Sequence, residues 1–403
     1  MERKVSSARA HLGWCSVLHV VTDGYIASLS LLIPFIAVDL GLSYTQSGLL
    51  KTASHLAIST AQIPAGFLAE KTGEIFLLGL GTAWFSAGYI GLLFAFGFPA
   101  TLAWILVSGI GGGVYHPVGT AFVSSVSTPE KAGSAVGILN FFGDIGKVLF
   151  PALAGILVIQ VGWRGTFAAL GGIGLIVSII FLLTFRREIH QRFPKRRDAP
   201  THGSEPDRIS EPGAGNPRGW GIRDRKQFTL FSLIGMVDIS IRSAVMAFLG
   251  FHLIQSGVRE DSVGWLLSLT FLGGALGKLL CGMPVARLGV KRLIFLTEFL
   301  MLAGCFALPS IPPGWSMLLF LPVFGFFLNG TSSILYIGLI PTLDEKLRSR
   351  GYAVFFTLNF LFAAISPYFF GLIGDGWGLP AIFYAAGLLM LAGLAIVGFL
   401  RKS

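Results

Sequence analysis

Acidic and basic side chains occur in pairs inside long apolar stretches of this chain. His19 and Asp23 stand four residues apart, and so do Asp238 and Arg242. Residues four apart lie on one face of a helix, where a carboxylate can orient an imidazole or neutralise a guanidinium. We expect His19 and Asp23 to carry coupling protons, or else to tie helices together by a hydrogen bond. Arg242 either holds an anionic substrate or is neutralised within its own helix by Asp238.

Asp144 and Lys147, three residues apart, leave the same two alternatives open, and Asp144 joins the predicted proton-coupling residues. Lys278 has no acid within four residues, so we expect its partner on another helix or in the substrate. Tyr115 and His116 follow three glycines and precede a proline, which frees a backbone carbonyl. They are either substrate contacts or structural groups.

Further polar residues lie in apolar segments and could bond either neighbouring helices or a ligand. The predicted substrate-binding residues, apart from the charged ones above, are therefore His116, Tyr115, Asn140, Asn329, Tyr336 and Asn359. Three bases and the titratable histidines face three acids inside the spans, and Lys147, Arg242 and Lys278 would disfavour a purely cationic substrate. A substrate with a negative group is therefore favoured. His55 is expected to be structural, and Glu298 has no role that the sequence explains.

The composition indicates which medium surrounds the segments that hold these charges. Of 403 residues, 53% are hydrophobic and 12% charged, against about 25% charged in a soluble domain. The bilayer is therefore the expected environment. No H-E-x-x-H, G-x-S-x-G or Walker pattern occurs, and the three cysteines have no metal-ligand spacing. We expect no enzyme, cofactor, metal site or nucleic-acid partner.

Crossing the hydrocarbon takes roughly 20 helical residues. The hydrophilic, proline-rich stretch 186–226 is expected to be a disordered cytoplasmic linker between an N-terminal six-helix bundle, 1–185, and a C-terminal one, 227–403. Twelve spans are predicted, at 13–38, 46–69, 75–96, 99–126, 133–158, 165–185, 227–254, 262–285, 291–309, 315–340, 350–374 and 378–400.

The basic residues orient the chain. They gather in the termini, the linker and the even-to-odd connections, whereas Arg164 and Arg259 fall on the opposite side. Both termini are therefore predicted to be cytoplasmic, in a bacterial-type inner membrane.

The halves resemble each other. Gly133 to Asn140 opens span 5 much as Gly351 to Asn359 opens span 11. The expected fold is an all-α membrane protein with twelve transmembrane helices in two six-helix pseudo-repeats, the layout of the major facilitator superfamily.

A loop motif supports this resemblance. Gly66-Phe-Leu-Ala-Glu70-Lys71-Thr-Gly73 is similar to the superfamily's G-x-x-x-D-R-x-G, and Arg287 and Gly289 repeat part of it after span 8, with Ala286 in place of the acid. The resemblance implies a gate that the acid and base hold closed. The alternative is an ordinary tight turn with cytoplasmic charges.

A narrower resemblance covers roughly residues 15–150. His19-Val-Val-Thr-Asp23, Gln62-Ile-Pro64-Ala-Gly66 and His116-Pro117 are similar to motifs of the fosmidomycin-resistance family of drug exporters. Val118 stands where that family has Glu, and Asp144 stands where it has Asn. The substrate and the mechanism of proton coupling therefore need not be those of the family.

The sequence thus predicts a monomeric secondary transporter that works by alternating access. Proton-coupled export of a small, anionic organic compound or drug is the favoured activity. Proton-coupled uptake of an organic anion and lysophospholipid flipping are the alternatives. Protons, the lipid bilayer and a small-molecule substrate are the expected partners.

Overall fold

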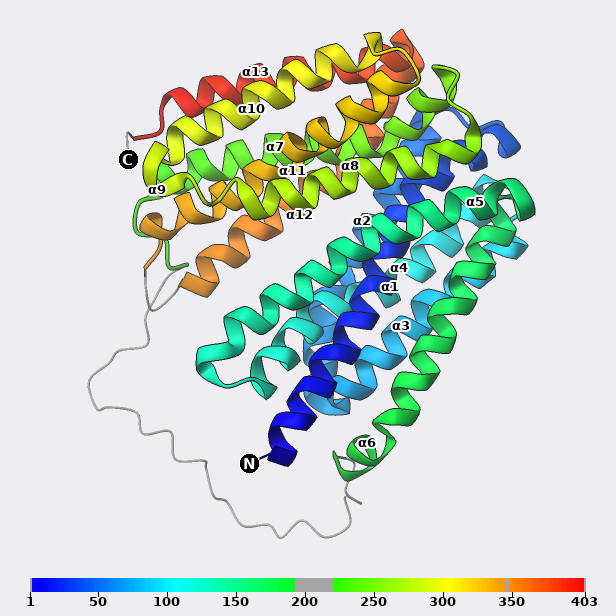
Figure 1. The fold of residues 1–403 in the computed structure, drawn as a ribbon, viewed down its shortest axis with the longest axis vertical. Helices are drawn as coiled ribbons and strands as arrows, with labels where there is room; N and C mark the ends of the chain where they lie inside the picture. Colours follow the sequence, from blue (N-terminus) through cyan, green and yellow to red (C-terminus); the bar gives the residue numbers. More distant parts are fainter. Residues whose placement is uncertain (1, 193–219, 345–347, 402–403) are drawn as a thin grey trace.

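A computed structural model describes residues 2–192, 220–344 and 348–401, and it is built of helices (Figure 1). The helices are α1 (Glu2–Leu40), α2 (Tyr44–Thr72), α3 (Glu74–Gly91), α4 (Phe98–Val126), α5 (Pro129–Thr184), α6 (Arg186–Arg192), α7 (Arg225–Gln255), α8 (Glu260–Leu280), α9 (Val285–Leu288), α10 (Val290–Ala307), α11 (Trp315–Leu339), α12 (Arg348–Trp377) and α13 (Leu379–Gly398).

Ten of the described helices are long and apolar enough to cross a membrane. The 56-residue α5 is broken at Gly162, whose φ of 67° and ψ of 175° are not helical. The break falls between two of the expected spans. α2 matches another expected span in position but is not one of the ten, and it carries Lys51, Glu70 and Lys71. The chain is therefore an all-α membrane protein.

Both ends of the expected linker are structured where the structure describes them. Residues 186–192 form α6, and the Glu188 carboxylate lies 2.9 Å from His11 Nε2 of α1. Ile222 pairs with Leu343 in an isolated antiparallel bridge, and the Asp224 side chain caps α7 by accepting the backbone N–H of Gln227. Residues 193–219, the rest of the expected linker, lie outside the described residues.

Figure 1 shows α1 to α6 grouped on one side and α7 to α13 on the other. One core cluster of buried side chains contains residues of both groups, such as Phe150 and Phe248. Two smaller clusters belong to one group each. Phe122 lies in the first of them and Phe231 in the second, both toward the ends of the helices where the chain termini lie. The two groups are thus joined at the end remote from the termini.

Polar contacts reinforce this junction. The Asp375 carboxylate of α12 accepts the backbone N–H groups of Tyr44 and Thr45, at 2.7 and 3.0 Å, in the first turn of α2. Gln255, at the end of α7, donates to the Tyr44 hydroxyl at 2.7 Å. Because a carboxylate satisfies orphan donors of a helix N-terminus, this contact fixes α2 against α12.

Glycines let the helices of the two groups meet backbone to backbone. A Cβ added at Gly48 of α2 would lie 2.2 Å from the Pro367 carbonyl oxygen of α12. One added at Gly264 of α8 would lie 2.4 Å from the Pro151 carbonyl oxygen of α5. Small residues at such crossings are a common device of membrane helix packing.

The loop motif has the same backbone in both halves. Gly73 ends α2 with φ 85° and ψ 141°, and Gly289 ends α9 with φ 77° and ψ 151°. Residues with a Cβ rarely adopt a positive φ of this kind, so glycine is required at both turns. The matched sequence motif therefore corresponds to a matched turn.

We expect Gly48→Ala to weaken the junction of α2 and α12, because the new methyl group must displace backbone atoms. Overpacking of this kind costs about 1–3 kcal/mol. The thermal midpoint of the detergent-solubilised protein, followed by tryptophan fluorescence, should fall. Gly137→Ala on α5 is the matched control, since a Cβ there meets nothing within 4 Å. Equal midpoints for both variants would contradict the proposed packing constraint.

Candidate functional site

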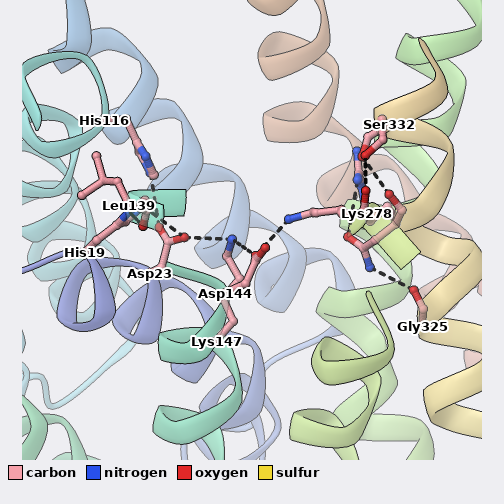
Figure 2. Close-up of polar contacts among 12 residues, drawn as sticks. His19, Asp23, His116, Leu139, Asp144, Lys147, Lys278, Gly325 and Ser332 are labelled. Atoms are coloured by element: carbon pink, nitrogen blue, oxygen red, sulfur yellow. Dashed lines mark hydrogen bonds and ion pairs between the residues drawn. The ribbon is translucent and has the colours of Figure 1, made fainter. Parts of the chain in front are cut away.

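A chain of ion pairs crosses from the first helix group to the second (Figure 2). Lys147 Nζ of α5 lies 2.8 Å from Asp23 Oδ2 of α1 and 2.9 Å from Asp144 Oδ1. The same Asp144 oxygen lies 2.9 Å from Lys278 Nζ of α8. Asp144 is therefore shared by two lysines, and its bond to Lys278 joins the halves through their charged side chains. Lys278, which lacks an acid on its own helix, has its partner on α5.

Two histidines surround Asp23. His19 Nδ1 lies 2.7 Å from the Leu139 carbonyl oxygen, so this nitrogen carries the proton and donates it. His19 Nε2 is 3.5 Å from Asp23 Oδ2, and His116 Nε2 is 3.4 Å from Asp23 Oδ1. A Cβ at Gly143 would lie 2.7 Å from both Asp23 Oδ2 and His19 Nε2. The missing side chain at residue 143 therefore lets α5 approach the pair.

A second group of charges lies on α7. Arg242 Nη2 donates to Asp238 Oδ2 at 3.1 Å, as the spacing predicts for an intrahelical pair. Arg242 Nη1 reaches Asn329 Oδ1 of α11 at 3.4 Å, while Asn329 Nδ2 donates to the Gly325 carbonyl oxygen. The predicted residues Asp238, Arg242 and Asn329 therefore form one cluster.

The accessible part of the network is basic. The side chains of His116, Lys278 and Lys147 are 39%, 34% and 26% exposed. Those of Asp144 and Asp23 are 17% and 4% exposed. The carboxylates thus lie behind the bases that they neutralise. A solute that reaches these exposed side chains meets hydrogen-bond donors and positive charge first.

The other polar candidates differ in position. The Tyr115 hydroxyl is buried and donates to the Cys15 carbonyl oxygen, and its ring lies 4.7 Å from that of His19. Asn359 is buried and donates to the Phe355 carbonyl oxygen. The Tyr115 hydroxyl and the Asn359 amide nitrogen are therefore each bonded to a backbone carbonyl, and their role in substrate binding stays a prediction. Asn140 is exposed, and Tyr336 is 39% exposed.

The expected gating residues lie apart from the charged network. Glu70, Lys71 and Arg287 are exposed, and none of them forms an ion pair with another described residue. A Cβ at Gly66 would meet nothing within 4 Å. Gly66 and Glu70 also line a hollow of about 380 Å³ between α2 and α4. This hollow contains no residue of the network, so we do not assign the substrate to it.

Two buried ionisable residues were not assigned a role from the sequence. Lys51 of α2 donates to the Ile26 carbonyl oxygen and to Ser30 Oγ at 3.1 and 2.8 Å, which ties α2 to α1. Glu298 of α10 is fully buried. Because a charge inside a span is costly, both residues stand out in the sequence, but a lone charge gives no indication of its partner.

His19, Asp23 and His116 could also hold a metal ion by geometry, since their ligand atoms lie within 4.8 Å of one another. A His that donates its other nitrogen to a carbonyl, as His19 does, is typical of metal sites. However, the Lys147 ammonium already neutralises Asp23 at 2.8 Å and would repel a bound cation. We therefore assign the ion pair, not a metal, to this carboxylate.

The arrangement can exchange ion-pair partners. Both lysines reach accessible space and both contact Asp144, so a negative group could replace a carboxylate at either one without leaving a base unpaired. Such an exchange costs less than creating an isolated buried charge, because each lysine keeps an acidic partner and Asp144 keeps Lys147.

Comparisons with known proteins bear on this site. The chain is similar to the hexuronate transporter of Bacillus subtilis, with 24% identity over 93% of this chain and 90% of that one. It is 26% identical to a probable L-galactonate transporter of Escherichia coli over 64% of this chain, a match that spans 56% of that protein's length.

Solved structures show the same fold. A bacterial homologue of the human lysosomal transporter Spinster, in an inward-facing and occupied conformation, matches 96% of this chain and 95% of its own with a TM-score of 0.75 at 14% identity. The structure of the Escherichia coli xylose transporter XylE matches 98% of this chain and 99% of its own, with a TM-score of 0.69 at 12% identity.

The relatives and the fold are those of membrane transporters, which confirms the exclusion of an enzyme. The family model of the Major Facilitator Superfamily matches residues 15–250 and 231–403. With the helices and the loop motif described above, this match establishes that the chain belongs to the Major Facilitator Superfamily of transporters.

Proposed function

We propose that this transporter carries a small organic anion of the sugar-acid class together with protons, in the direction of uptake. The observation that carries the substrate class is the exposure of the network, in which bases face the accessible space and carboxylates lie behind them. The names of two relatives, a hexuronate and an L-galactonate transporter, support the same chemistry.

Electrostatics favours symport over antiport for such a substrate. A proton and an anion attract each other, so each strengthens the binding of the other in a site of low dielectric. Antiport requires the two to exclude each other. Proton-coupled uptake is therefore the better-supported activity. Export, lysophospholipid flipping and the narrower likeness to fosmidomycin exporters stay predictions from the sequence.

The fold proposed for this activity has twelve spans in two six-helix halves. α2 and the two parts of α5 on either side of Gly162 would bring the ten apolar helices to twelve. The excess of basic residues near the termini supports a cytoplasmic location for both ends. The junction at the remote end would then face away from the cytoplasm, and a single chain would suffice for alternating access.

In the proposed cycle, the substrate carboxylate displaces Asp144 from Lys278. Lys147 continues to neutralise Asp144, while Asp23 and His19 exchange the coupling proton. Loss of the Asp144–Lys278 bond would free the two halves to rock about their junction. The ion pair thus couples substrate binding to the movement of the helices.

The substrate class is tested in proteoliposomes with an inward proton gradient. We expect galacturonate or galactonate to accumulate and to carry protons, which an internal pH dye reports. Galactose, a cationic drug and a lysophospholipid serve as comparisons. Accumulation of the cation, with no response to either acid, would overturn the proposal.

Lys278→Met should raise the half-saturation concentration for the sugar acid by about 10- to 100-fold, because a charge-assisted hydrogen bond of about 1.5–3 kcal/mol is lost. Radiolabelled counterflow measures this value. Arg259→Met removes an exposed base outside the network and should leave it unchanged. The proposed role of Lys278 would fail if both variants bound the acid as wild type does. Lys278→Met alone removes one of the two bases beside Asp144. The double variant Lys278→Met/Asp144→Asn removes the acid as well, and it shows whether this charge imbalance causes misfolding.

Asp23→Asn should abolish proton-driven accumulation but retain counterflow, since Lys147 keeps Asp144 as its partner. Accumulation under a pH gradient and exchange without one are compared in the same vesicles. Asp261→Asn, a change outside the network, is the control. Unchanged proton-driven accumulation in Asp23→Asn would remove Asp23 from the coupling mechanism.

A further inference from the structure

Aromatic side chains of the second half form a contiguous cluster toward the end of the helices where the chain termini lie. The Phe356 ring of α12 stacks on the Tyr352 and Phe360 rings, with centroids 6.1 and 6.3 Å apart. It meets the Tyr336 ring of α11 edge-on at 5.3 Å. The Tyr352 hydroxyl donates to the Tyr336 carbonyl oxygen at 2.9 Å, which ties α12 to α11. The transport cycle proposed above makes no use of these rings.

Tyr336 lies on the side of α11 that faces away from the interior of its own half. A Cβ added at Gly338 would lie 2.5 Å from Phe231 of α7 and 2.8 Å from Val290 of α10, so that side of α11 is packed. Two residues along a helix correspond to a rotation of about 200°, which puts Tyr336 on the opposite side. Its side chain is accordingly 39% exposed.

Phe360 lies on the side of α12 that faces the first half. Pro367 and Gly371, seven and eleven residues further along, share this side of the helix and contact α2 at the junction. A Cβ at Gly48 would lie 2.2 Å from the Pro367 carbonyl oxygen, and one at Gly371 would lie 2.5 Å from the Tyr44 carbonyl oxygen. The two helix groups diverge toward the termini (Figure 1), and Phe360 is 44% exposed there. This side of α12 therefore faces the first half rather than lipid.

The cluster begins one helical turn from a base of the charged network. The Ser333 hydroxyl of α11 donates to the Lys278 carbonyl oxygen at 2.7 Å, and Tyr336 follows Ser333 by three residues. The Lys278 side chain is 34% exposed and pairs with Asp144. The remaining atoms of a small acid that replaces Asp144 at Lys278 would be within reach of the aromatic rings.

A flat apolar surface with polar groups at its border suits a sugar ring. The faces of a pyranose carry C–H groups, which pack on aromatic rings, while its hydroxyls point outward from the ring edge to donors and acceptors. The exposed Thr357 follows Phe356 on α12, and Asn329 lies two turns from Tyr336 on the same side of α11. An open-chain acid has no ring face with which to cover the aromatic surface.

We infer that Tyr336, Phe356 and Phe360 form a ring-binding surface beside Lys278, which selects sugar acids in the pyranose form over open-chain acids. The inference rests on the proposed function, from which it takes the bond between Lys278 and the substrate carboxylate. It narrows the substrate class to hexuronates. Their carboxylate is remote from the aldehyde carbon through which the ring closes, whereas an aldonate carries its carboxylate at that carbon and stays open.

Wild-type transport in proteoliposomes tests the ring selection without any substitution. The half-saturation concentration in counterflow should be about 10-fold lower for galacturonate than for galactonate, which has the same charge. Equal values, or a preference for galactonate, would overturn the inference and leave the proposed function standing. If wild type transports neither acid, the proposed function fails and the inference falls with it. Phenylacetate has a flat ring without hydroxyls, and stronger inhibition by it than by galacturonate would refute the pyranose assignment.

Substitution of a ring tests the surface itself. Phe356→Leu keeps an apolar side chain but removes the flat face, so the half-saturation concentration for galacturonate should rise about 5- to 10-fold and that for galactonate should stay within about twofold. Retained galactonate counterflow also shows that the variant is folded. Phe369→Leu is the matched control, because Phe369 is 56% exposed on the side of α12 opposite to Phe360, and it should change neither value.

Two results of this comparison would contradict the ring-binding surface. An unchanged value for galacturonate in Phe356→Leu would show that the ring does not touch the substrate. An equal rise for both acids would show that the rings serve the packing of the two halves during transport, without selecting a substrate.

Discussion

The sharing of one carboxylate by two lysines is the interaction on which the structure depends. Asp144 pairs with Lys147 on its own helix and with Lys278 on α8, each at 2.9 Å. In a medium of low dielectric an ion stripped of its partner is far costlier than in water, so the two halves are held in register by charge neutrality. The same condition makes the contact exchangeable, because Asp144 stays neutralised by one lysine when the other binds something else.

The opposite constraint acts at the remote end, where the halves meet through backbone. Gly48 and Gly264 place carbonyl groups where side chains would otherwise stand, and Asp375 binds the first turn of α2. Such close backbone contacts allow one geometry only, and a substrate cannot replace one partner at a time as it can in an ion pair. A protein that is fixed by shape at one end and by exchangeable charge near its centre has the requirements for rocking of one half against the other.

The sequence predicted what depends on neighbours along a helix and missed what depends on neighbours in space. Four-residue spacing was sufficient to identify the His19–Asp23 and Asp238–Arg242 pairs, since a helix brings such residues together. The partner of Lys278 lies 134 residues away, and no local pattern indicates it. The linker was misjudged at its ends because α6 and the Asp224 cap depend on contacts with α1 and on one side chain. The number of spans is ambiguous because α2, which carries Lys51, Glu70 and Lys71, is not among the helices that are apolar enough to cross a membrane.

A buried acid without a base beside it differs from the ion pairs in how it can be neutral. The pairs could be interpreted from the sequence because each contains its own counter-ion, and each is neutral when its acid is ionised and its base carries a proton. Glu298 has no such counter-ion, so its neutrality requires a proton.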